Sequence, residues 1–230
     1  MFETLNVLEA EVDVLITDVT EMASGTYCVA GWDIAGTKMV RPLPNGSNWS
    51  AALLTQHGIV AGKLIRVTPG GASNGVFPHR TEDTLIDLAS ITTLSGVFTD
   101  WLGPSAPQVA ADLKSGFGGF LQSNKTWNGV KQGVHTPPSV QCSSLVAVRV
   151  PKPNLVFTES FGKLKATLNN GFDSYQLTVS SKALKEAWRN GGLVGVTNAL
   201  PARNELHVRV GLARPFDNPP KCYAMLNGVL

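Results

Sequence analysis

The fold is decided by a series of β-rich segments that begins with SLVAVRV at residues 144–150. This segment has period-two character, which is typical of a strand with one buried face. Two similar segments follow, KLKATL (163–168) and YQLTV (175–179), and Asn169-Asn170-Gly171 between them is a strong signal for a β-hairpin. We therefore expect an antiparallel sheet over this part of the chain.

A helix and two more strands complete this pattern. The helix KALKEAWR (182–189) has Ser180 or Ser181 as its N-cap and is expected to end at NGG (190–192). The last two strands are expected at 205–212 and 221–226. Five strands with a helix between the third and the fourth are typical of an OB-fold, a Greek-key barrel that binds oligonucleotides or oligosaccharides. The helix is therefore predicted to plug this barrel.

The N-terminal part of the chain shows the same kind of meander. Its strand-like segments are separated by turn residues, and they are VDVLIT (12–17), TYCVAGWD (26–33), TKMVRP (37–42) and KLIRV (63–67). The Gly- and Asn-rich region 116–133 is expected to be a long surface loop. We predict a mostly β protein of two OB-like Greek-key barrels with short helices. Residues 1–140 are assigned to a first OB-like domain with a helical insertion and 141–230 to a second, and the two should meet near 135–145.

Composition places the chain among ordinary globular proteins. It is 43% hydrophobic and 16% charged, which excludes a disordered chain. The sequence has neither a long apolar run nor a signal-peptide pattern, so we expect a cytoplasmic location and no membrane partner. The cysteines Cys28, Cys142 and Cys222 are far apart and show no zinc-ligand spacing. They are interpreted as reduced, buried side chains, and no metal or other cofactor is expected.

Several short motifs together resemble the bacterial dual OB-containing domain family. In the first half they are VLI (14–16), GTYCVAGWD (25–33) and VRP (40–42), and in the second half SLV (144–146), YQLTV (175–179) and LHVRVGL (206–212). Two departures are Lys38-Met39, where the family has Trp-Ile, and Ser180-Ser181, where an Asp-Pro often follows. The resemblance implies two OB-like domains and a nucleic-acid-binding role in bacteria or their phages, often beside defence genes.

The charge is divided unevenly between the two halves. Residues 1–145 contain 8 Lys/Arg and 12 Asp/Glu, whereas residues 146–230 contain 11 Lys/Arg and 5 Asp/Glu. A basic half suits a polyanion such as nucleic acid, although a solvated basic surface explains the same count. The candidate nucleic-acid-binding residues are Arg41, Arg149, Lys163, Lys165, Tyr175, Arg209 and Arg214.

Strand geometry supports individual members of this set. Lys163 and Lys165 are two positions apart on a predicted strand, so they must share a face, whereas Arg41 must face away from Lys38. Arg41 could bind a phosphate or pair with an acidic residue such as Asp33. Aromatic side chains that stack on bases are expected to be Tyr175, Phe172 and Trp127, because they lie at strand ends or in the predicted loop.

Three functional hypotheses follow. The first is a non-catalytic protein that binds single-stranded or structured DNA or RNA, in the setting of an accessory factor of bacterial or phage defence. The second is a hydrolase-type enzyme with a site around His79 and Glu82 in the first domain, where a capped helix start explains the same residues. The third is a protein-interaction module whose acidic N-terminal half docks a basic partner. The histidines match no known catalytic or metal motif, so we expect binding rather than catalysis.

Overall fold

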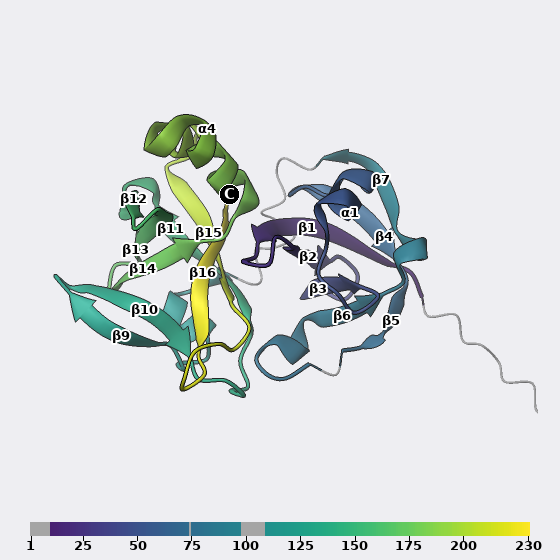
Figure 1. Cartoon of the computed structure of the whole chain (residues 1–230), viewed down its shortest axis with the longest axis horizontal. Coiled ribbons are helices and arrows are strands. Elements are labelled where there is room, and N and C mark those ends of the chain that lie inside the picture. Colours follow the sequence, from purple (N-terminus) through teal and green to yellow (C-terminus); the bar gives the residue numbers. More distant parts are fainter. Residues whose placement is uncertain (1–9, 74, 98–108) are drawn as a thin grey trace, which may run out of the picture.

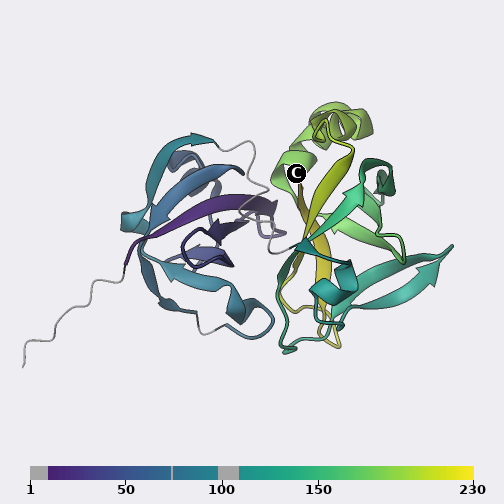
Figure 2. The same cartoon turned by 180° about the vertical axis from the view of Figure 1, so that it is seen from behind.

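The computed structural model describes residues 10–73, 75–97 and 109–230, and it shows a mostly β protein with two curled sheets side by side (Figures 1 and 2). The first sheet consists of β1 (Val12–Glu21), β2 (Tyr27–Asp33), β3 (Lys38–Pro44), β4 (Lys63–Val67), β5 (Pro69–Ala72), β6 (Asp83–Ile86) and β7 (Thr92–Val97). Its helical elements are α1 (Ala51–Gln56) and the short 3₁₀ turns at His79–Thr81 and Leu88–Ser90.

The first sheet closes into an OB-like barrel. Its strands lie in the order β5-β6-β3-β2-β1-β4-β7. Strands β4 and β5 are separated only by Thr68, and they pair with β1 and β6 respectively, so together they act as one bent strand. Strand β3 is parallel to β6, and α1 connects β3 to β4. This is the Greek-key arrangement of an OB-fold, with the helix between the third and fourth strands.

The second sheet carries the same arrangement with additional strands. Its elements are β8 (Val109–Ala110), α3 (Leu113–Gly116), β9 (Gln122–Trp127), β10 (Val130–Thr136), β11 (Leu145–Pro151), a 3₁₀ turn (Lys152–Asn154), β12 (Leu155–Ser160), β13 (Lys163–Asn169), β14 (Ser174–Val179), α4 (Lys182–Ala199), β15 (Glu205–Leu212) and β16 (Cys222–Val229). Strands β11 and β12 form one bent first strand, because β11 pairs with β15 and β12 pairs with β13. Strand β14 is parallel to β16, and α4 connects β14 to β15.

Several parts of the structure differ from the sequence-based expectation. Residues 109–136, assigned to the first domain, pair within the second sheet, and the expected helical insertion of the first domain contains the strands β6 and β7. Strand β12 was not predicted, since only one run was assigned between residues 144 and 163. The region 116–133 is not a plain surface loop, because it contains most of the β9–β10 hairpin, which projects from the second barrel in Figure 2. Helix α4 begins after the predicted cap Ser181, departs from helical geometry at Gly191 and Gly192, and then resumes to Ala199.

Each barrel has its own apolar core, and a third cluster joins them. The first core includes Ile16, Trp49 and Ile65, and the second includes Leu184 and Val196 of α4, so the helix does fill the second barrel. The joining cluster contains Leu15, Ala30, Trp32 and Met39 from the first barrel and Leu145 from the second. The contact between the barrels thus includes the predicted region 135–145 and also reaches β1 and β3. No helix in the described ranges is long and apolar enough to cross a membrane.

Candidate nucleic-acid interface

The outer face of strands β12, β13 and β14 is the part of the second barrel that corresponds to the ligand-binding face of an OB-fold. Residues along β13 alternate regularly between buried and solvent-facing positions. Lys163 and Lys165 both lie on the solvent-facing side, which confirms that they share a face. In the next strand, Gln176 and Thr178 face the same way, so the outer surface of the two strands carries polar groups.

The two lysines have no anionic partner on this face. Lys165 pairs across the sheet with Thr158 and Thr178, and its Nζ donates a hydrogen bond of 2.7 Å to Thr178 Oγ1. Within the described residues, no carboxylate lies within ion-pair distance of the Lys163 or Lys165 ammonium group. Partial burial, and secondly the neighbouring charge of Lys163, hold the pKa of Lys165 below its ordinary value. A bound polyanion would reduce the repulsion between these two adjacent cations, because it would supply the missing counter-charge.

Exposed aromatic side chains lie at both ends of this face. Phe161, in the turn between β12 and β13, is 100% exposed, and Phe172, in the turn between β13 and β14, is 92% exposed. Trp127, at the tip of the β9–β10 hairpin, is 66% exposed. It pairs with Val130, which in turn lies beside Ser174, so Trp127 and Phe172 belong to the same end of the barrel. Exposed rings at the two ends of the face are placed where aromatic side chains can stack on bases.

The sequence marks the positions of Trp127 and Phe161 with signals of different strength. The Asn128-Gly129 pair, with φ of 48° and 75°, forms the hairpin turn next to Trp127, and such a pair is a known hairpin signal. Phe161 was missed because strand β12 was missed. Its φ is 50° and Gly162 follows it, so a Ser-Phe-Gly turn between two short strands was the available signal.

Tyr175 is placed differently from the other aromatic candidates. Its side chain is in the core of the second barrel and only 2% exposed, because it lies at an inward position of β14. Its hydroxyl donates a hydrogen bond to Asp173, and the Lys131 ammonium lies 5.3 Å from the ring centroid. Burial raises the pKa of Tyr175 well above its ordinary range. The ring therefore offers no surface for base stacking in this conformation.

Arg149 is exposed, but it lies on the β11–β15 side of the barrel. Its side chain is 52% exposed, and its Nε donates a hydrogen bond of 3.0 Å to His207 Nε2. Glu205 lies 3.8 Å from the same Nε. Burial, and secondly the Arg149 charge, lower the pKa of His207. This arginine is therefore apart from the Lys163 face and partly neutralised by its own neighbours.

Arg41 and Arg214 both pair with Asp83, in the contact between the barrels. The Arg41 side chain is 4% exposed and its Nη1 lies 2.7 Å from Asp83 Oδ1, while Arg214 Nη2 lies 2.6 Å from Asp83 Oδ2. Arg41 also donates a hydrogen bond to Ser144 of the second barrel. Arg41 therefore has an acidic partner, Asp83 rather than Asp33, and a phosphate cannot reach it in this conformation. Arg214 remains 40% exposed at the edge of the same contact.

Arg209 joins the barrels at a second point. Its Nε donates a hydrogen bond of 2.8 Å to Asp18 Oδ2 of β1, and the two side chains are 2% and 1% exposed. Met39 Sδ lies 3.3 Å from Arg209 Nη2. Arg209 is thus buried like Arg41, and its contacts connect β15 with β1 and β3.

His79 and Glu82, the residues of the hydrolase alternative, belong to this contact as well. His79 Nε2 lies 2.9 Å from the Leu212 carbonyl oxygen, and burial with the nearby Arg41 lowers the pKa of His79 to about 4. Glu82 accepts hydrogen bonds from Thr81, from Ser143 and from the backbone and hydroxyl of Ser144. Both side chains are buried, and their hydrogen bonds tie the two barrels together. Among the described residues, no hydroxyl or thiol group forms a hydrogen bond with His79.

Comparison with known proteins adds no assignment. No family model matches the chain, and no curated protein sequence matches it. A solved structure of a murine DNA-binding protein bound with double-stranded DNA resembles it with a TM-score of 0.37 and 7% sequence identity, over 96% of this chain and 93% of that chain. A TM-score of this size establishes neither a shared fold nor a shared function.

Proposed function

We propose that the protein binds single-stranded nucleic acid along the outer face of β12, β13 and β14, without catalysis. The observation that carries this proposal is the pair Lys163 and Lys165, which lie on the same face of β13 and have no carboxylate partner within the described residues. Strand-face lysines at this spacing suit the phosphates of a nucleic-acid backbone. The proposed site thus involves fewer basic residues than the charge count of residues 146–230 suggested.

The flanking aromatics favour a single strand over a duplex. A base can stack on Phe161 or Phe172 only if it is unpaired and turned out of its own stack, which a single strand permits at low cost. Thr158, Gln176 and Thr178 between them carry uncharged hydrogen-bonding groups that suit sugar and base edges without imposing one sequence. OB-fold proteins with this combination cover about 4 to 16 nucleotides.

The dual OB-containing resemblance supports the same proposal, and with it a role as a bacterial or phage accessory factor. The hydrolase and the protein-interaction hypotheses stay predictions, and the buried positions of His79 and Glu82 speak against the first.

The test is fluorescence anisotropy with a labelled oligonucleotide across a salt series. Replacing Lys163 and Lys165 together by Ala should weaken binding about tenfold, because exposed ionic contacts contribute about 0.2 to 1 kcal/mol each. It should also lower the magnitude of the salt slope by about 1.4, since each lost phosphate contact removes about 0.7 on a single strand. The matched control, Lys63→Ala with Arg80→Ala in the first barrel, removes the same charge and should change neither quantity.

The aromatic part of the proposal has a separate readout. Phe161→Ala and Phe172→Ala should each reduce affinity by about 1 to 3 kcal/mol while leaving the salt slope unchanged, because stacking releases no counterions. Absence of binding at low salt would reject nucleic-acid binding altogether. Equal losses from the control variant would reject the location on β13.

A further inference from the structure

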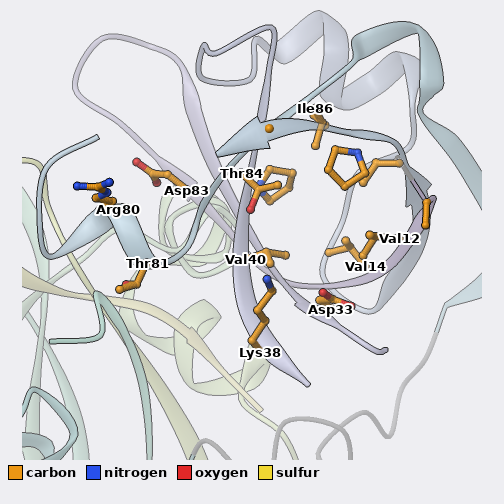
Figure 3. Close-up of a pocket in the computed structure, with 15 residues that line it drawn as sticks. Val12, Val14, Asp33, Lys38, Val40, Arg80, Thr81, Asp83, Thr84 and Ile86 are labelled. Atoms are coloured by element: carbon orange, nitrogen blue, oxygen red, sulfur yellow. The ribbon is translucent and has the colours of Figure 1, made fainter. Parts of the chain in front are cut away.

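The first barrel contains a cavity of about 420 Å³ at the opening where β1 begins (Figure 3). Its walls are aliphatic, with Val12 and Val14 from β1, Val40 from β3 and Ile86 from β6. Small-molecule sites in proteins measure about 300 to 1,000 Å³ and combine apolar walls with a few polar groups. The cavity has the size and the lining of a site for a small ligand.

Four charged residues line this cavity: Asp33, Lys38, Arg80 and Asp83. Asp83 is already paired with Arg41 and Arg214, whereas Asp33 and Lys38 are brought to the cavity by strand periodicity. On β3, Lys38 lies two positions before Val40, so both face the inside of the barrel, whereas Met39 faces the contact with the second barrel. On β2, Asp33 lies directly opposite Lys38 and is also paired with Val14 of β1. Asp33 and Lys38 therefore form one row at the mouth of the cavity, above the aliphatic side chains.

Asp33 is a buried carboxylate without a cation. The residue is 6% exposed, and among the described residues its only hydrogen bond comes from the Gly36 backbone N–H to Oδ1, at 2.8 Å. A buried carboxylate is normally paired with a cation, because the loss of hydration is otherwise uncompensated. Asp33 lines the cavity, so an ammonium group placed there would supply the missing partner.

Lys38 offers the complementary charge. In Figure 3 its ammonium group points from β3 into the space bordered by Val40 and Thr84, which also line the cavity. Within the part of the chain that the structure describes, Lys38 has no carboxylate at ion-pair distance, Asp33 included. The mouth thus presents one negative and one positive group on neighbouring strands, whose Cβ atoms are about 5 Å apart in such a pair.

We propose that this cavity binds a free α-amino acid with an aliphatic side chain. The ligand's ammonium group lies against Asp33 Oδ2, its carboxylate accepts from Lys38 Nζ, and its side chain packs among Val14, Val40 and Ile86. A zwitterion fits this row because its two charges are held on one carbon atom. A simple anion would meet repulsion from Asp33, and a simple cation would meet repulsion from Lys38.

The test is isothermal titration calorimetry of the whole chain with leucine and two analogues. 4-Methylpentanoate lacks the ammonium group, and isoamylamine lacks the carboxylate. Leucine should bind one-to-one and about tenfold more tightly than either analogue, since each charge-assisted hydrogen bond contributes at about that level. No saturable binding of leucine up to about 10 mM, or equal binding of all three compounds, would overturn the proposal.

Variants separate the two charges. Asp33→Asn keeps an acceptor for Gly36 and should weaken leucine about tenfold without weakening 4-methylpentanoate, whereas Lys38→Met should weaken leucine without weakening isoamylamine. Val12→Phe at the rim should fill the cavity and abolish binding, with circular dichroism confirming that the variant is folded. Loss of affinity for all ligands in both charge variants would contradict the assigned contacts. Oligonucleotide binding uses the other barrel and should be unchanged by leucine, so the two proposals fail independently.

Discussion

Replacing Arg209 by Met should be among the most destabilising single changes in this protein. The variant removes the guanidinium group from Asp18, a side chain that is 1% exposed in the wild-type protein, and among the described residues only the Thr17 hydroxyl still donates to it. Removing one partner of a buried ion pair costs about 3 to 5 kcal/mol, because the remaining charge is neither hydrated nor paired. That is a large fraction of the 5 to 15 kcal/mol that typical domains possess.

A double-mutant cycle identifies the orphaned charge as the cause. The pair leaves two atoms unsatisfied in the wild-type protein, since Asp18 Oδ1 and Arg209 Nη1 are buried and have no hydrogen-bond partner among the described residues. Changing Asp18 to Asn in the Arg209→Met background removes the uncompensated charge, so the double variant should recover about 2 kcal/mol relative to Arg209→Met alone.

The assay is urea unfolding followed by tryptophan fluorescence and by circular dichroism. Because Arg209 and Asp18 join the two barrels, the wild-type protein should unfold in one transition with both probes, and Arg209→Met should either shift the midpoint or separate two transitions. A loss of less than about 1 kcal/mol with a single unshifted transition would refute the reasoning. It would mean that water reaches Asp18 when the arginine is removed.

Three further outcomes are expected. The pKa of His79 is lowered from 6.5 to about 4, so between these pH values the unfolded chain binds a proton at His79 and the folded protein does not. Stability should therefore be full above pH 6.5 and fall by at most about 3 kcal/mol as the pH drops to 4, a loss that His79→Gln should remove in urea titrations at several pH values. The pKa of Glu21, bound to Arg189 and Lys185, is lowered to about 2, and so a smaller loss should follow between pH 4.5 and 2 that is absent in Glu21→Gln. Gly31→Ala would place a Cβ atom 2.4 Å from Val14 Cγ1 and 2.8 Å from the Leu15 carbonyl oxygen, so it should cost about 1 to 3 kcal/mol in thermal unfolding, whereas the Cβ atom of Gly58→Ala has no described atom within 4 Å, so that variant should lose stability only through its φ of 57°.

Local geometry explains which predictions could be made from the sequence. The shared face of Lys163 and Lys165, and the opposite directions of Lys38 and Arg41, follow from the two-residue period of a strand. The hairpin after Asn169 and the cap at Ser181 depend on neighbours within a few positions. By contrast, the β9 strand QSNKTW has no apolar alternation, because neither of its faces is buried in the core, so only its Asn128-Gly129 turn marks it.

What the sequence by itself determined is therefore the inner and outer faces of the strands that it marks and the OB order of the second half. The tertiary structure alone decided what each face meets. Arg41 pairs with Asp83 across 42 positions and Arg209 with Asp18 across 191, so two arginines that suit phosphates equally well are buried between barrels. The face of β13 remains open at Lys163, whose side chain is exposed among the described residues. Strand periodicity is a local property of the chain, whereas burial depends on the packing of segments far apart in the sequence.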